Sequence, residues 1–430
     1  MKFNTRKPYI FLLVAASALV SALSIIKYGV LTTADTESYI NAFDVYMSGG
    51  IDKFRTPIYP IFLGIMKGIF GSHFPLATII VQHIIFIATL PFFFSLTEKL
   101  FKSLPFSMIL SVLLLLAIEI ANWNNFLMTE SLSTSLTILL LFSLYNLVKK
   151  PSVPTFLTCL LLSVLILLIR PAFIYLIPAF CIFFVILLFS KKHRKASAYY
   201  CMAITAALTI VASAYVIVFH NVFGVYAFSN VSIVNKYYTL RQNGLIDTSE
   251  SSNSALVADI ENFKKINGET NRFIRRTYYE IQTLDSIYPL YDIDKIVTSS
   301  ISHNKGKCAS LVLGRFRMAM TDYDTVPVSF YSLVKNKITY IYLVLLFATI
   351  IIAWGFIRRR EPNQWLLMLY VLAMGHFATT FIGAQGDWYR LLEPAMPIFL
   401  LLAGEIFIRH IKPRLPRVPS RNKQAGASTR

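Results

Sequence analysis

A cluster of ionisable residues follows the first apolar stretch of the chain. The segment ADTESY carries Asp35 and Glu37, and RTPIYP, which ends at Pro60, carries Arg55 and Tyr59. A carboxylate can accept a proton from an attacking hydroxyl, and a guanidinium can grip a phosphate through two hydrogen bonds. A carboxylate at the start of a helix can equally cap backbone N–H groups, so a helix N-cap at Asp35 is the structural alternative.

Arg170 is the most informative of the polar residues elsewhere in the chain. It is the only charge in the apolar run 152–190, and Pro171 after it predicts a helix break there. A charge at such a place is costly unless paired or solvated, which indicates function, with snorkelling to lipid headgroups as the alternative. The other polar residues predicted at the same level are Glu119, Glu130, His220, Asp387, Arg390 and Glu393.

Several kinds of site have no motif in this sequence. No His/Cys cluster has the spacing of metal ligands, so we predict no metal and no other cofactor. No nucleophile elbow, Walker loop or dinucleotide fingerprint is present, which disfavours a serine hydrolase or an enzyme of soluble nucleotides.

The elements that must position these residues are membrane helices. The 430 residues are 56% hydrophobic and 15% charged, which is too apolar for a soluble domain. We therefore predict an all-α polytopic membrane protein, because apolar runs of about twenty residues recur and each can cross a bilayer as a helix. The predicted crossings, about ten, are 8–30, 74–97, 105–120, 131–148, 152–169, 171–190, 198–220, 337–357, 364–382 and 391–409.

The formal net charge of +19 is explained by topology. Bases gather in alternate connections, including KKHRK at 191–195 and RRR at 358–360, which follows the positive-inside rule and predicts that both termini are cytoplasmic. We therefore expect a bilayer as partner and no nucleic acid.

Two polar regions are predicted outside the membrane. The first outer loop, 31–73, contains an amphipathic interfacial helix that Gly49-Gly50 ends, then a second short helix before 74. The segment 221–336 shows helical periodicity and predicts a small helical cap. The predicted organisation is a membrane module at 1–220, this cap, three further crossings within 337–409, and a basic cytoplasmic tail at 410–430.

The order of several motifs resembles the GT-C superfamily of integral-membrane glycosyltransferases. The motifs are ADTESY, the GG pair and RTPIYP, then TESL at 129–132, Arg170-Pro171 and DWYRLLEPAMP near the C-terminus. The resemblance is closest to bacterial relatives of protein O-mannosyltransferases and lipid A aminoarabinose transferases. It covers most of the membrane part, whereas 221–336 matches only by position.

This resemblance implies sugar transfer from a polyprenyl-phosphate carrier on the periplasmic face of a bacterial inner membrane. The acceptor is a cell-surface glycolipid, a glycan or a protein. Asp35 occupies the position of the family's base, whereas Glu37 departs from the usual adjacent acidic pair and its role stays open. Arg170 is the first candidate to receive the leaving phosphate, with Arg55, His220 and Arg390 as alternatives. Glu130, Tyr59 and Asp387 are further candidates for substrate binding.

Two other classes of protein remain as alternatives. An O-antigen type polymerase or ligase also has about ten crossings and lipid-linked substrates, but relies mainly on basic groups in late outer loops. A lipid or glycan transporter would need charges distributed through the membrane depth. Replacing Asp35 with Asn should abolish transfer under the first interpretation and matter little in a ligase.

Overall fold

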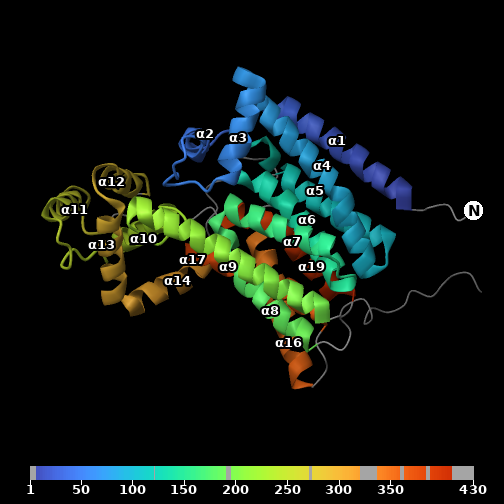
Figure 1. Ribbon diagram of the computed structural model, residues 1–430. Coiled ribbons are helices and arrows are strands. Elements are labelled where there is room, and N and C mark those ends of the chain that lie inside the picture. Colours follow the sequence, from blue (N-terminus) through green and yellow to red (C-terminus); the bar gives the residue numbers. More distant parts are fainter. Residues whose placement is uncertain are drawn as a thin grey trace, which may run out of the picture.

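The protein is a bundle of helices with a helical lobe at one end (Figure 1). The structure, a computed structural model, describes residues 6–120, 122–189, 195–270, 274–319, 337–358, 363–383 and 388–408. These residues form no β-strand, and one isolated bridge pairs Leu31 with Phe126. The all-α prediction is therefore confirmed for this part of the chain. The helices are α1 (Arg6–Tyr28), α2 (Ala34–Met47), α3 (Ile58–Phe70), η1 (Gly71–His73), α4 (Phe74–Phe101), α5 (Leu104–Ile120), η2 (Trp123–Asn125), α6 (Thr129–Lys149), α7 (Val153–Ile169), η3 (Pro171–Tyr175), α8 (Leu176–Leu188), α9 (Lys195–Phe223), α10 (Val231–Gln242), α11 (Ser254–Asn267), α12 (Ile274–Ile287), α13 (Leu290–His303), α14 (Lys305–Ala319), α16 (Lys337–Ile357), α17 (Gln364–Gly383), α18 (Trp388–Leu391), η4 (Glu393–Ala395) and α19 (Met396–Ile406).

Six of the described helical stretches are long and apolar enough to cross a membrane. They are Arg6–Tyr28, Ile58–Phe101, Thr129–Lys149, Pro171–Leu188, Lys195–Phe223 and Gln364–Gly383, with shorter apolar helices at Leu104–Glu119, Val153–Ile169 and Tyr340–Gly355. A multi-pass membrane protein is thus supported, while the number ten stays a prediction.

Helix α6 lies inside the bundle, packed between α4 and α7. Its buried face carries small polar residues, including Ser133, Thr134 and Thr137, whose hydroxyls donate to carbonyls one turn earlier. Small side chains that satisfy themselves in this way let apolar helices approach closely in a membrane. The helix therefore forms a fixed support for Glu130 in its first turn.

Helices α2 and α3 confirm the two short helices predicted in the first outer loop. Helix α2 ends before Gly49, which has a φ of 78°, in the left-handed region that glycine tolerates. The Phe43 ring packs directly on Gly64 of α3, where an added Cβ would lie 2.0 Å from the ring. This close contact fixes α2 against α3.

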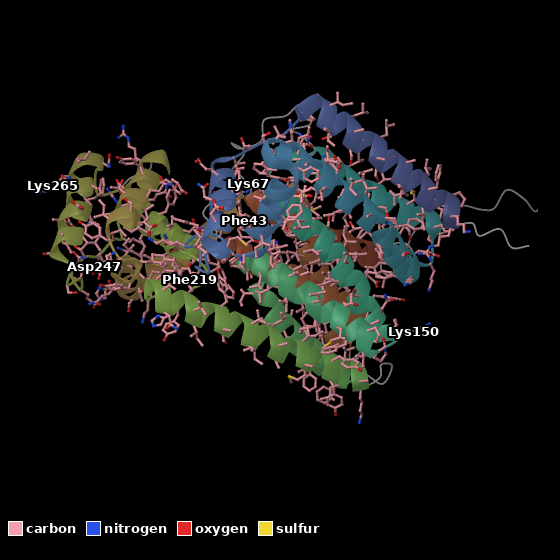
Figure 2. The ribbon with its side chains drawn as sticks, turned by 45° about the horizontal axis from the view of Figure 1, so that its top comes forward. Phe43, Lys67, Lys150, Phe219, Asp247 and Lys265 are labelled. Carbon is pink, nitrogen blue, oxygen red and sulfur yellow. The ribbon has the colours of Figure 1, made fainter. Side chains whose placement is uncertain are left out.

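The lobe at one end, which we call the cap, comprises α10 to α14 within residues 231–319. It has its own apolar core, with Tyr237, Leu256, Leu284 and Val297 among the buried residues. Figure 2 shows Asp247 and Lys265 of the cap at the opposite end of the molecule from Lys150. Phe43 lies between these ends, so α2 stands where the cap meets the bundle.

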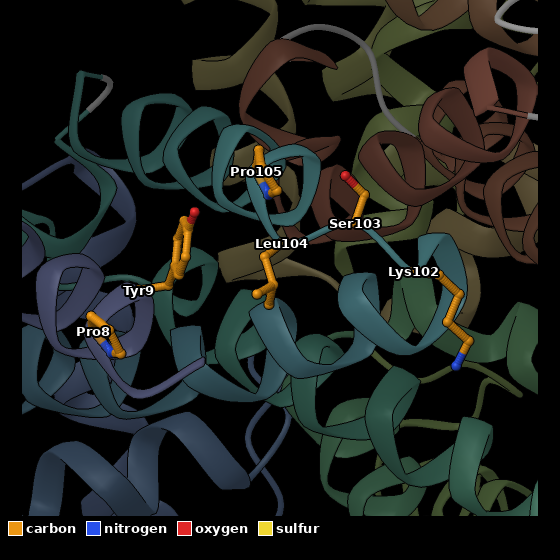
Figure 3. A pocket seen from close by; sticks show the side chains of 6 residues that line it. All are labelled: Pro8, Tyr9, Lys102, Ser103, Leu104 and Pro105. Atoms are coloured by element: carbon orange, nitrogen blue, oxygen red, sulfur yellow. The ribbon is translucent and has the colours of Figure 1, made fainter. Parts of the chain in front are cut away.

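A hollow of about 700 Å3 lies at the beginning of α1 (Figure 3). It is lined by Pro8, Tyr9 and the turn from Lys102 to Pro105. From Tyr9 at the hollow, α1 runs to Tyr28 before the chain reaches α2, a length of about 29 Å at 1.5 Å per residue. This hollow is therefore remote from the predicted polar cluster.

Candidate active site

Asp35 lies in the first turn of α2, with its carboxylate between two guanidiniums. Oδ1 accepts from Arg55 Nη2 at 2.8 Å, and Oδ2 accepts from Arg390 Nη1 at 3.2 Å. The helix is capped by Thr33, whose hydroxyl accepts from the Asp35 amide at 3.2 Å. The alternative of Asp35 as the N-cap is therefore wrong, and its side chain is left to bind basic groups.

The Arg55 side chain contacts Asp35, Ser38 and Tyr39. Its Nε donates to Ser38 Oγ at 2.7 Å, and its guanidinium lies over the Tyr39 ring, 4.2 Å from the centroid. Asp52 accepts hydrogen bonds from the backbone amides of Phe54 and Arg55, which closes the loop between α2 and α3. These contacts fix the guanidinium toward Asp35 before any ligand binds.

A second carboxylate, Glu130, continues the cluster on α6. Its Oε1 lies 3.6 Å from Arg390 Nε and 3.4 Å from Arg170 Nη1. The predicted helix break at Arg170 is confirmed, because α7 ends at Ile169 and Arg170 has extended backbone angles. Arg390 thus bridges the two carboxylates, and among the described residues Arg170 is linked to Asp35 through Glu130 and Arg390.

A backbone pairing between two linkers brings Asp35 and Glu130 together. Leu31 donates its amide to the Asn125 carbonyl at 2.9 Å, and its carbonyl accepts from Leu127 at 3.1 Å. Leu31 lies three residues before the start of α2, and Leu127 lies two residues before the start of α6. The starts of these two helices are therefore held side by side.

The electrostatics of this group favour an ionised Asp35 and an added anion. Burial alone would raise the pKa of Asp35, but the charges and hydrogen bonds of Arg55 and Arg390 outweigh it and hold the pKa below its ordinary value. The cluster, defined as Asp35, Arg55, Glu130, Arg170 and Arg390, contains three guanidiniums and two carboxylates. Its formal charge of about +1 suits an anionic ligand.

A buried polar network packs around the linker that precedes α6 and Glu130. Glu119 Oε1 accepts from Asn124 at 2.8 Å and lies 3.2 Å from His83 Nδ1. Gln82 accepts from the Tyr59 hydroxyl at 2.8 Å and donates to the carbonyls of Asn124 and Phe126. The network holds the linker that leads into α6. Gln82 and His83 were not singled out from the sequence, although two adjacent polar residues inside an apolar helix are such a signal.

Three of the predicted residues, Glu37, His220 and Tyr59, lie outside the charged cluster. Glu37 is exposed on α2. His220 stacks on Tyr226 at the end of α9, with ring centroids 3.8 Å apart. Tyr59 is fully buried and packs edge-on against Tyr39, so it supports the ring beneath Arg55. Asp387 lies outside the described residues.

Within the described ranges, no group of three or more His, Cys, Asp or Glu side chains is arranged to hold a metal ion. No protein-family model matches the chain, and no curated protein matches it.

Among solved structures, the chain is similar to the crystal structure of ArnT from Cupriavidus metallidurans bound to undecaprenyl phosphate. The identity is 14%, the match covers 95% of this chain and 81% of that chain, and the TM-score is 0.38.

Proposed function

We propose that the chain is a membrane glycosyltransferase that moves a sugar from a polyprenyl-phosphate carrier to an extracytoplasmic acceptor. The observation that carries the proposal is the Asp35 carboxylate held between Arg55 and Arg390. It joins a proton acceptor and a phosphate-binding pair in one site. The acceptor is a cell-surface glycolipid, a glycan or a protein, and the enzyme lies in a bacterial inner membrane with both termini cytoplasmic.

The reaction is a single displacement. The acceptor hydroxyl attacks the anomeric carbon, the bond from this carbon to the phosphate oxygen breaks, and Asp35 takes the hydroxyl proton. The leaving polyprenyl phosphate gains negative charge, which the guanidiniums stabilise. A phosphate needs no protonation by a second carboxylic acid, so one base suffices.

Arg55 and Arg390 replace Arg170 as the first candidates for the phosphate. Both contact Asp35 directly, whereas Arg170 contacts Glu130. Without donor, the two guanidiniums neutralise Asp35 and weaken it as a base. A bound phosphate competes for the same guanidiniums, and this exchange frees the carboxylate at the moment when the donor is in place. Glu130 then retains Arg170 and keeps Arg390 within reach.

The test measures sugar transfer by Asp35→Asn. We expect transfer to fall about 10²- to 10⁴-fold, the usual contribution of a general base. Asp44→Asn is the matched control, since Asp44 is exposed on the same helix, and it should keep wild-type transfer. The assay is mass spectrometry of glycolipids in a deletion strain complemented with each variant, which also identifies the sugar.

Two results would contradict the proposal. If Asp35→Asn restores the missing sugar unit as well as wild type does, Asp35 is not the base and the ligase alternative gains support. If the deletion strain exports an altered lipid without any change in glycosylation, the transporter alternative is favoured.

A further inference from the structure

The cap contacts both chain segments that deliver arginines to Asp35. Arg55 belongs to the loop between α2 and α3, and Arg390 to α18, far apart in the sequence. A third element that binds both segments can keep Arg55 and Arg390 at a fixed distance without a direct contact between the segments. The cap and the neighbouring end of α9 make such contacts.

The first contact is made at Lys53, two residues before Arg55. Its Nζ lies 2.6 Å from Asp285 Oδ1 of α12 and donates to the Asp285 carbonyl at 3.0 Å. The Lys53 carbonyl accepts from the amide of Asn230, at the start of α10, at 2.8 Å. Both the backbone and the side chain of Lys53 are thus bound to the cap.

Tyr46 reinforces this attachment from the other side of the loop. Its hydroxyl donates to the Arg55 carbonyl and lies 3.2 Å from the Tyr215 hydroxyl of α9. Helix α9 ends at Phe223, and after seven further residues the chain enters the cap at α10. Displacement of the cap would therefore pull on the backbone at Arg55 itself.

The second contact is made at the end of α17. Asn235 of α10 donates to the Gly383 carbonyl at 2.8 Å. Gly383 is the last residue of α17 and precedes Arg390 by seven positions. One helix of the cap therefore contacts both the Arg55 loop and the chain that leads to Arg390.

The Lys53–Asp285 pair is poorly suited to a purely stabilising role. Asp285 is only 7% exposed in its side chain, and burying opposite charges costs about as much as their attraction returns. Such a pair adds little net stability, but it fixes the distance and orientation of the Arg55 loop relative to α12. This property suits a contact that must set the place of a neighbouring catalytic group.

We propose that Lys53 and Asp285 are positioning residues, through which the cap sets the separation of the Arg55 and Arg390 guanidiniums. Asn235 has the same positioning role for the segment that carries Arg390, through its hydrogen bond to the Gly383 carbonyl. This inference rests on the proposed function, because that separation decides whether both guanidiniums meet on one carboxylate or on one phosphate. The cap is thereby part of the donor site, although its helices lie outside the charged cluster.

The experiment compares the full-length protein in nanodiscs with Lys53→Met, Asp285→Asn and the charge swap that joins Lys53→Asp with Asp285→Lys. Hydrogen exchange is measured for peptides covering 48–57 and 388–396, and kcat and KM for a polyprenyl-phosphate sugar. Glu261→Gln is the control, since it breaks the Lys264–Glu261 ion pair at the cap surface. Asn235→Ala tests the second contact independently.

We expect Lys53→Met and Asp285→Asn to speed exchange at Phe54 and Arg55 and to lower kcat/KM about tenfold, mainly through kcat. The charge swap should restore at least part of the slow exchange and of the wild-type kcat/KM. Glu261→Gln should change neither the exchange nor kcat/KM. Asn235→Ala should speed exchange in 388–396. Wild-type exchange and wild-type kcat/KM in both single Lys53–Asp285 variants would overturn the inference, as would lost thermal stability with unchanged kinetics. If the wild type transfers no sugar at all, the proposed function fails, while the exchange data still report on the contact.

Discussion

Two carboxylate–guanidinium groups in this molecule use the same chemistry for different ends. In the cap, Arg241 and Glu280 are both fully buried, and Arg241 Nε donates to Glu280 Oε2 at 2.9 Å. The remaining Arg241 donors bond to Glu280 Oε1 and to the carbonyls of Phe263, Gly268 and Glu269. In the charged cluster, the Asp35, Arg55 and Arg390 side chains are 29%, 14% and 20% exposed.

The difference lies in what each group can still bind. Arg241 has one carboxylate partner and a full set of acceptors, so exchange for another anion would leave buried charges uncompensated. The five described residues of the charged cluster include three guanidiniums and two carboxylates, and the side chains of Asp35, Arg55 and Arg390 are partly exposed. The buried Arg241–Glu280 pair therefore stabilises the fold, whereas the guanidiniums of the partly exposed charged cluster can exchange a carboxylate for another anion.

Breaking the closed pair should have the largest effect on stability. Glu280→Gln leaves a buried guanidinium without its counter-charge, and we expect the free energy of unfolding to fall by about 3–5 kcal/mol. Thermal or denaturant unfolding in detergent measures it. Glu261→Gln, at a more exposed ion pair, should stay within about 0.5 kcal/mol of wild type. Equal effects of the two substitutions would contradict the structural role of Glu280.

Weakening the open cluster should alter the pH dependence of activity instead. The kcat/KM profile reports ionisations of the free enzyme, and the pKa of Asp35 lies below its ordinary value. The wild-type profile should therefore show no acid limb from Asp35 between pH 7 and about pH 5.

Arg390→Gln removes one of the two charges that lower the Asp35 pKa. The acid limb should then move toward neutral pH, and kcat/KM at pH 7 should fall at least about tenfold, or about 1.4 kcal/mol. Arg390→Lys keeps the charge and should shift the limb less. An unmoved acid limb in Arg390→Gln would show that Arg390 does not control the ionisation of Asp35.

An exposed ion pair in the cap should show the smallest effect. His303 Nδ1 lies 2.6 Å from Asp247, and this hydrogen bond, with the nearby Glu250, raises the pKa of His303. A raised folded-state pKa stabilises the fold below about pH 6.5, and this contribution is lost as the pH rises through that pKa. The melting temperature should therefore fall slightly above neutral pH, and Asp247→Asn should flatten this dependence. The same slope in Asp247→Asn would exclude His303 as its source.

The sequence predicted the elements better than the partners of their side chains. The helix break at Arg170, the end of α2 before Gly49 and the start of α6 beside Glu130 all follow from local preferences of proline, glycine and apolar runs. Such preferences act over a few residues. They also place Asp35 at a helix start, although they do not show that Thr33 supplies the cap.

The pairing of Asp35 with Arg390 had no local signal. The two residues are 355 positions apart, and they meet because the Leu31–Phe126 bridge and the packing of α6 bring their linkers together. The Arg241–Glu280 pair was missed for a related reason, because both residues lie on helices whose charges look solvent-exposed in sequence. Tertiary packing decides which charges are buried.

The most direct measurement is the affinity of polyprenyl phosphate, without sugar, for the wild-type protein and for Asp35→Asn in nanodiscs. If the phosphate must displace Asp35 from Arg55 and Arg390, the neutral amide competes less. The variant should then bind about tenfold more tightly, while its sugar transfer falls about 10²- to 10⁴-fold. Asp44→Asn should bind as the wild type does. Equal or weaker binding by Asp35→Asn would contradict the exchange of partners on which this account depends.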